Sequence, residues 1–119
     1  MELTIKNVTY PLKASFGFLN TIEKKDRRSV SGETVDVGLA SAITMMNEAG
    51  DMRCLADLLL ALNTGMKPKL ERAVLEEWLA DECEDIEGLC AEVMDFLSRA
   101  NVCRVRLKKL GLLTQIPKA

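Results

Sequence analysis

The sequence predicts a mainly helical single domain of about five helices with a short N-terminal β-hairpin, which is an α+β fold. Residues 1–12 alternate apolar and polar side chains as short strands do, whereas later residues repeat apolar side chains at three- and four-residue spacings. A chain of 119 residues, 48% hydrophobic and 29% charged, suits one globular domain. Because no long linker or internal repeat divides it, the apolar stripes can close one core.

The hairpin is predicted from two short alternating segments. Their apolar residues are Leu3, Ile5, Val8, Tyr10 and Leu12. Lys6-Asn7 separates the segments, and asparagine tolerates the left-handed backbone that a tight turn requires. Because a two-stranded ribbon alone is marginally stable in water, we expect this one to pack against the helices.

Five helices are predicted from the apolar spacing that begins near residue 15. They cover about residues 15–25, 36–50, 51–63, 68–81 and 85–100. Four of them open with side chains that suit a helix N-cap, namely Ser15, Asp36, Asp51 and Asp85. Pro68 suits the first turn of the remaining helix, and Gly50 ends the second. The third helix has the most apolar stripe and should be central to the core, whereas residues 29–33 are predicted to form a loop.

Charge is distributed unevenly toward the C-terminus. From Glu71 to Asp95 there are ten acidic residues and one basic residue, whereas Phe96 to Ala119 carries six basic residues and no acidic one. We therefore divide the chain into a helical domain, residues 1–100, and a basic-apolar tail, residues 101–119. The tail can fold back on the acidic helices, bind a partner protein or bind nucleic acid. The slightly negative net charge and the absence of aromatic residues in the tail weigh against nucleic acid.

Catalysis, a metal and a cofactor are not expected. The chain has no histidine, which is the commonest general base and metal ligand, and it has neither a phosphate-binding loop nor a dinucleotide fingerprint. Its paired carboxylates crowd a helix end and are interpreted as a solvated acidic face. The cysteines form no C-x-x-C pair and are interpreted as buried or partly buried thiols, at Cys54, Cys83, Cys90 and Cys103.

The sequence also predicts a cytosolic protein without membrane contact. Its longest purely apolar run, Leu58 to Leu62, is far shorter than a membrane span, and the N-terminus lacks a signal-peptide core. Residues 42–62 have the outline of a helix-turn-helix, but Arg53 and Asp57 are the only charged residues of the second helix. That helix is interpreted as a core helix, so the nucleic-acid alternative depends on the basic tail.

A series of short motifs follows the hairpin in a fixed order. They are Phe16-Gly17-Phe18-Leu19 with Ile22, Asp36-Val37-Gly38-Leu39, Gly50-Asp51 before Leu55-Ala56-Asp57, Lys67-Pro68, and Asp85-Ile86-Glu87 with Leu89 and Glu92-Val93. In order and spacing, residues 1–100 resemble the tail assembly chaperone family of siphophages and related prophages of Gram-positive bacteria. The segment after Asn101 is longer and more basic than the family pattern.

The resemblance implies a noncatalytic function. A family member would bind the long, helical tape measure protein, keep it soluble and help tail tube protein polymerise around it. It would act in the host cytoplasm and be absent from the mature virion. Self-association stays open, and the alternative function is a small regulatory protein that binds nucleic acid through its basic tail.

Two sets of side chains are candidates for partner binding. Methionines repack easily around different partners, and the candidates are Met45, Met46, Met52 and Met94. At helical spacing the same methionines can instead fill the core. The second set is basic and belongs to the predicted tail, namely Arg104, Arg106, Lys108 and Lys109.

Overall fold

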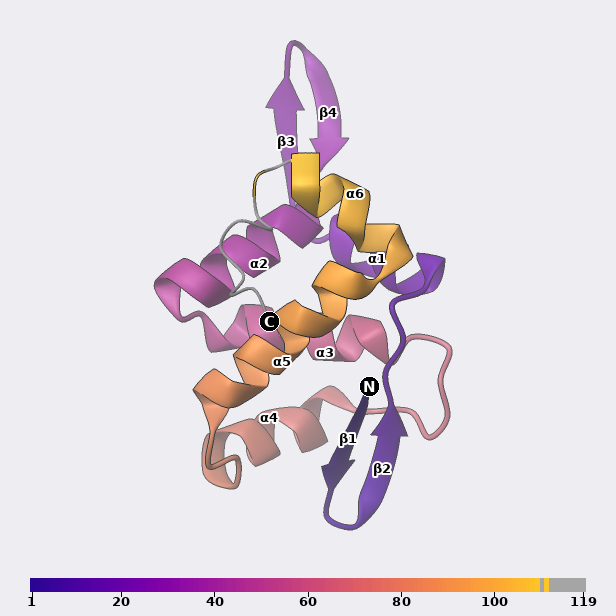
Figure 1. Ribbon diagram of the computed structural model, residues 1–119, viewed down its shortest axis with the longest axis vertical. Helices are drawn as coiled ribbons and strands as arrows, with labels where there is room; N and C mark the ends of the chain where they lie inside the picture. Colours follow the sequence, from indigo (N-terminus) through magenta and orange to yellow (C-terminus); the bar gives the residue numbers. More distant parts are fainter. Residues whose placement is uncertain (110, 112–119) are drawn as a thin grey trace.

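The computed structural model describes residues 1–109 and residue 111. Within them it has six helices and two antiparallel hairpins, which confirms the predicted α+β fold. In chain order the elements are β1 (Glu2–Ile5), β2 (Val8–Pro11), α1 (Phe16–Glu23), β3 (Arg27–Val30), β4 (Glu33–Asp36), α2 (Gly38–Ala49), α3 (Met52–Leu62), α4 (Arg72–Asp81), α5 (Ile86–Arg99) and α6 (Asn101–Lys109). The hairpins lie at opposite ends of the long axis, with the helices between them (Figure 1).

The predicted N-terminal hairpin is confirmed. Strand β1 pairs with β2 so that Leu3 faces Tyr10, and Lys6 and Asn7 form the turn with positive φ angles of 50° and 68°. The inward side chains Leu3 and Tyr10 are buried, together with Ile5. The hairpin therefore contributes to the common core, as a two-stranded ribbon must in order to be stable.

A second hairpin replaces the loop predicted at residues 29–33. Strands β3 and β4 pair antiparallel, and Ser31 and Gly32 form the turn with φ angles of 53° and 82°. All of β3 is exposed, and the amide of Val37 donates to the carbonyl oxygen of Asp26 at 2.8 Å and closes the base of the hairpin. The loop prediction was wrong because neither face of this hairpin is buried, so its sequence has no apolar alternation.

Helix α2 begins against the end of α1. The prediction that Asp36 caps this helix was wrong, because Asp36 ends β4 and Val37 occupies the N-cap without a side-chain hydrogen bond. A carboxylate from α1 replaces it, since Glu23 Oε1 accepts a hydrogen bond from the amide of Leu39 at 2.8 Å. Gly38 packs on the backbone of Ile22 so closely that a Cβ at position 38 would overlap the Ile22 carbonyl oxygen.

Three other caps follow the prediction. The hydroxyl of Ser15 accepts from the amide of Phe18 at 3.1 Å, Asp51 Oδ1 accepts from Arg53 at 2.9 Å, and Asp85 Oδ1 accepts from Gly88 at 2.9 Å. Gly50 follows the last residue of α2 and caps its C-terminus. Its φ of 64° turns the chain out of the helix. These side chains satisfy backbone amides that have no partner within their own helix.

Helix α4 starts later than predicted. Pro68 lies outside it, in a loop that contains a cis Lys67-Pro68 peptide bond. Buried Asn63 organises this loop, because its Nδ2 donates to the carbonyl oxygens of Pro11 at 3.0 Å and Pro68 at 3.2 Å. Its Oδ1 accepts from the amide of Leu70 at 2.7 Å. The placement of Pro68 therefore depends on a tertiary hydrogen-bond network that local propensity does not indicate.

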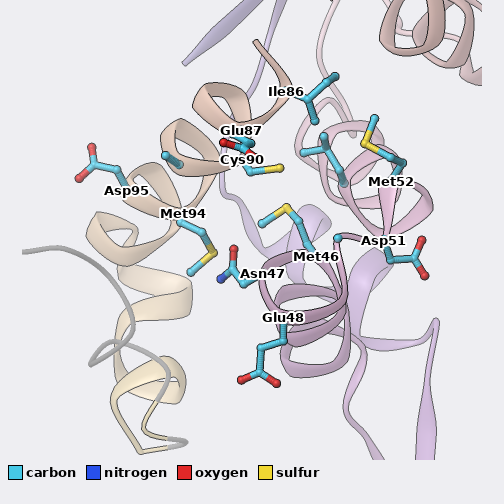
Figure 2. A pocket seen from close by; sticks show the side chains of 13 residues that line it. Met46, Asn47, Glu48, Asp51, Met52, Ile86, Glu87, Cys90, Met94 and Asp95 are labelled. Carbon is cyan, nitrogen blue, oxygen red and sulfur yellow. The ribbon is translucent and has the colours of Figure 1, made fainter.

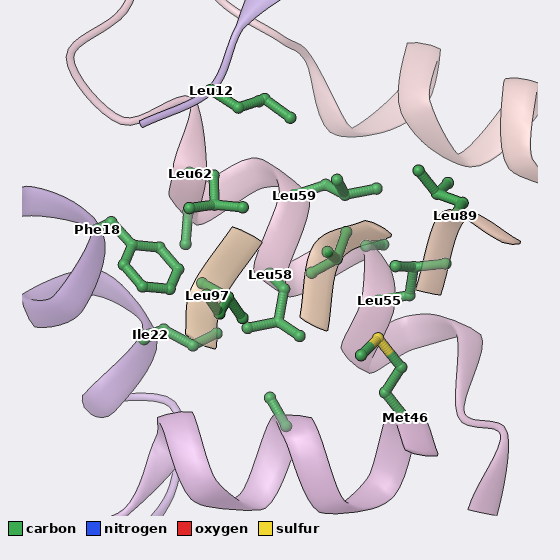
Figure 3. Close-up of a cluster of buried hydrophobic side chains, with 14 of the residues drawn as sticks. Leu12, Phe18, Ile22, Met46, Leu55, Leu58, Leu59, Leu62, Leu89 and Leu97 are labelled. Atoms are coloured by element: carbon green, nitrogen blue, oxygen red, sulfur yellow. The ribbon is translucent and has the colours of Figure 1, made fainter. Parts of the chain in front are cut away.

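Helix α3 is central to the core, as predicted. Leu55, Leu58, Leu59 and Leu62 are all fully buried. Around them lie side chains from the N-terminal segment and from α1, α2 and α5, namely Leu12, Phe18, Ile22, Met46, Leu89 and Leu97 (Figure 3). In the described part of the chain, no helix has the length and apolar character needed to cross a membrane.

Helix α6 follows α5 after a break at Ala100, whose backbone is extended. It contacts α1 and α5, and its side chains Cys103 and Leu107 are fully buried. The first part of the predicted tail is thus a packed helix, while the boundary at residue 100 stays a prediction. Residue 110 and residues 112–119, including the apolar end of that tail, lie outside the described residues.

Candidate partner-binding groove

A groove of about 1050 Å³ lies between α5 and the turn that joins α2 to α3. Figure 2 shows side chains from both sides pointing toward it. Its apolar and sulfur-containing lining consists of Met46, Met52, Leu55, Ile86, Cys90, Ala91 and Met94. The groove is therefore a mainly apolar surface built from three helices.

Helix α5 presents two apolar stripes, and each serves a different surface. Leu89, Val93 and Leu97 are spaced by four residues and are buried in the core. Residues 86, 90 and 94 have the same spacing and line the groove. Because residues four apart share one face of a helix, the second stripe runs along the groove wall.

The opposite wall is set by the tight connection between α2 and α3. Gly50 ends α2 with a left-handed backbone, and Asp51 caps α3 one residue later. As a result, Met46 from the end of α2 and Met52 from the start of α3 line the same groove. Met46 and Met94 are only 4% and 5% exposed and lie at the foot of the two walls, where they form the floor, whereas Met52 is 38% exposed.

Acidic side chains lie along the groove edge. Among the described residues that line it are four carboxylates and no basic side chain; the carboxylates are Glu48, Asp51, Glu87 and Asp95. Two of them are paired with arginines just outside, since Arg53 Nε lies 3.3 Å from Asp51 and an Arg99 nitrogen lies 3.0 Å from Asp95. The hydrogen bond from the Arg53 side chain lowers the pKa of Asp51, so this carboxylate stays charged at neutral pH.

Cys90 is the groove residue with a reactive group. Burial is the main cause that raises the pKa of its thiol, and the neighbouring Cys83 and Glu87 act in the same direction. The thiol is therefore protonated at neutral pH and contributes an apolar surface rather than a nucleophile. All four cysteines are free, with Cys103 buried and the other three partly buried, which agrees with the interpretation from the sequence.

The structure brings together three of the four candidate methionines. Met45 lies elsewhere, beside Val37 and Ala40 at a separate pocket of about 310 Å³, and is 41% exposed. Ile86 and Cys90 were not among the candidates predicted from the sequence, although their four-residue spacing with Met94 widens the apolar face of α5. That these residues bind a partner stays a prediction.

The four basic candidates have different environments. Arg106 is partly buried, and its guanidinium donates to Glu23 Oε2 at 3.0 Å and to the carbonyl oxygen of Asp36 at 2.9 Å. It therefore joins α6 to α1 and to the end of the second hairpin. The other three candidates, Arg104, Lys108 and Lys109, are exposed on α6. Within residues 1–109 and 111, no cluster of three or more metal-binding side chains is found.

Comparison with known proteins identifies the family. A family model described as phage tail assembly chaperone protein, TAC, matches residues 2–111, which include every helix of the groove and also α6. Neither a curated protein nor a solved structure gives a match to the chain. The family match covers almost the whole sequence and agrees with the resemblance noted from its motifs. The chain therefore belongs to the phage tail assembly chaperone family.

Proposed function

We propose that this chaperone binds the tape measure protein, keeps it soluble and promotes polymerisation of the tail tube protein around it. The role in tail assembly follows from the family, and the choice of partners is our proposal. The observation that carries it is the groove of about 1050 Å³, which has an apolar floor and an open apolar edge at Met52. The function requires no catalysis and takes place in the host cytoplasm before the virion is complete.

The physical basis is the covering of apolar helix faces. A long helical protein that has not yet been enclosed by the tail tube exposes apolar stripes, and such stripes aggregate unless another surface buries them. Grooves between helices bind amphipathic helices through anchors at three- and four-residue spacing. The groove wall of α5 offers complementary positions at residues 86, 90 and 94, and the methionines on the floor can adapt to different anchors.

Coexpression tests this proposal. The tape measure protein should be recovered in the soluble fraction in larger amount when this chain is present, and the two should copurify at moderate salt. An unrelated small helical protein expressed at the same level serves as the control. Equal solubility of the tape measure protein with and without this chain, together with failure to copurify, would refute the proposal.

A variant of α6 distinguishes the groove from the basic helix. Replacing Arg104, Lys108 and Lys109 together by glutamine removes three exposed charges but leaves the pairing of Arg106 with Glu23 unchanged. We expect this variant to retain rescue of the tape measure protein. Loss of rescue would assign partner binding to α6, and binding to DNA or RNA that weakens steeply with salt would favour the nucleic-acid alternative.

A further inference from the structure

We propose that the groove selects an amphipathic helix whose apolar stripe is flanked by lysine or arginine residues. This inference rests on the proposed function and specifies the chemistry of the tape measure segment that is bound. It follows from two observations on the same surface, namely the apolar floor and the acidic edge. Neither observation alone would identify the occupant.

The apolar part of the groove matches a helix. The wall residues Ile86, Cys90 and Met94 are spaced by one helical turn, so they form a line along α5. The facing wall places Met52 at the start of α3 and Met46 at the end of α2. A helix lying between these walls would bury one stripe on the floor and leave its two flanks beside the edges.

The carboxylates at the groove edge determine which charge the flanking residues of the bound helix should carry. Carboxylates lie at the outer rim of both walls, with Asp51 on one side and Glu87 and Asp95 on the other, and the side chains of Asp51 and Asp95 turn outward (Figure 2). Arg53 contacts both carboxylate oxygens of Asp51, and Arg99 pairs with Asp95, so the charge of these two residues is largely offset by arginines outside the lining. Helix α5 also belongs to the segment from Glu71 to Asp95, which has ten acidic residues and one basic residue. Basic flanks would therefore be attracted, chiefly on the α5 side at Glu87, whereas acidic flanks would be repelled.

Two synthetic peptides test this selectivity directly. Both have about 18 residues, or ~27 Å when helical, with the same leucine stripe, and their flanking residues are lysine in one and glutamate in the other. Fluorescence anisotropy should show that the lysine peptide binds about tenfold more tightly than the glutamate peptide at low salt. The difference should shrink as salt is raised, because exposed charges are screened. Equal affinities, or no binding of either peptide, would overturn the inference.

Two methionines provide a matched pair of variants. Met52 and Met45 are 38% and 41% exposed, each on a helix, but only Met52 lines the groove. Met52→Gln should weaken binding of the lysine peptide about tenfold, since it places an uncharged polar amide against the apolar anchors without adding a charge to the groove. Met45→Gln should leave the affinity unchanged. Equal effects of the two substitutions would show that the groove is not the site.

A second matched pair of variants, both on α5, tests the electrostatic contribution to peptide binding. Glu87 lines the groove, whereas Glu92 is exposed on the same helix outside the lining. Glu87→Gln should weaken the lysine peptide about threefold and reduce the salt dependence, while Glu92→Gln should do neither. If Glu92→Gln has the same effect as Glu87→Gln, the general charge of α5 and not the groove edge attracts the peptide, and the inference fails.

Two further measurements separate this inference from the proposed function. If the tape measure protein copurifies equally with wild type and Met52→Gln, the chaperone function stands and the groove inference is wrong. If wild type binds the lysine peptide but not the tape measure protein, the groove inference stands and the proposed function is wrong. Sedimentation tests a second copy as the occupant, and a dimer that Met52→Gln dissociates would also overturn the inference.

Discussion

The two hairpins have four-residue strands and turns with positive φ, yet they differ in what stabilises them. In the N-terminal hairpin, Leu3 is 7% exposed and Ile5 is 1% exposed, so one face belongs to the core. In the second hairpin all of β3 is exposed, and Val30 is 53% exposed. Its charged contact between Arg27 and Asp36 lies at the surface, where an ion pair contributes little.

The difference shows that one secondary structure can have two physical origins. Burial stabilises the first hairpin and leaves a visible alternation in its sequence. Local turn geometry and the hydrogen bond from Val37 to Asp26 stabilise the second hairpin. These contributions leave no apolar alternation in its sequence. Four measurements test how far this separation holds.

The largest expected effect distinguishes the two hairpins directly. Ile5→Asp places an unpaired charge in the core and should lower the free energy of unfolding by about 4 kcal/mol. Val30→Asp, on the exposed hairpin, should change it by no more than about 0.5 kcal/mol. Urea denaturation of both variants measures the difference. Similar losses would show that the second hairpin is buried against the protein in solution.

The second prediction concerns the attachment of the first hairpin. Asn63→Ala removes the hydrogen bonds to the partly buried carbonyl oxygens of Pro11 and Pro68 and leaves the buried amide of Leu70 without this partner. We expect a loss of about 3 kcal/mol in the same denaturation experiment. Asn20→Ala, at an exposed position of α1, is the control and should stay within about 0.5 kcal/mol of wild type. An unchanged midpoint for Asn63→Ala would contradict the network.

The third prediction concerns the base of the second hairpin. Glu23→Ala removes both the cap on Leu39 and the partner of Arg106, and should cost about 2 kcal/mol. Hydrogen exchange at the Leu39 amide should accelerate as well. Glu33→Ala, at an exposed position of β4, should leave both quantities unchanged. If Leu39 stays protected in Glu23→Ala, another group caps α2.

The smallest effect is a pH dependence next to this base. Burial first, and the charge of Glu23 second, raises the pKa of Cys103 from 9.0 to about 11. Between these values the unfolded chain loses the thiol proton while the folded protein keeps it, so stability falls as pH rises. The contribution of the protonated Cys103 thiol to the free energy of unfolding is fully present below pH 9, and about 1.4 kcal/mol of it is lost by pH 10.

Comparison with Cys103→Ala isolates this group, because the other titrating side chains are common to both proteins. The stability difference between wild type and variant should shift by this amount, against wild type, as pH rises from about 8 to 10. Urea denaturation at a series of pH values measures it. A difference that stays constant over this range would show that the thiol titrates at its ordinary pKa.

Local signals predicted much of the fold. The alternation of Leu3 and Ile5 indicated the first hairpin, and Asp51 and Asp85 cap the helices that they were expected to cap. The failures occurred where distant residues decide the local structure. Glu23 replaces the expected cap at Asp36, and Asn63 holds Pro68 in a loop.

The candidate site was predicted only in part. The adaptable side chain of methionine selected Met46, Met52 and Met94 as candidates, but the sequence could not show that the α2–α3 turn places them beside α5. The sequence also could not distinguish Met45 from these three methionines, although Met45 lies at another pocket. Arg106 was grouped with exposed basic residues because its partner Glu23 is far away in sequence.

The closed base of the second hairpin makes it a convenient place to modify the protein. Asp26 and Val37 are joined by a backbone hydrogen bond, and Gly38 next to them packs directly on Ile22. The chain between these points leaves and re-enters the helical body at one place, so its length can change without moving α1 or α2. A peptide tag or fluorescent label inserted between Ser31 and Gly32 should therefore be displayed away from the groove and report on tail assembly without disturbing it.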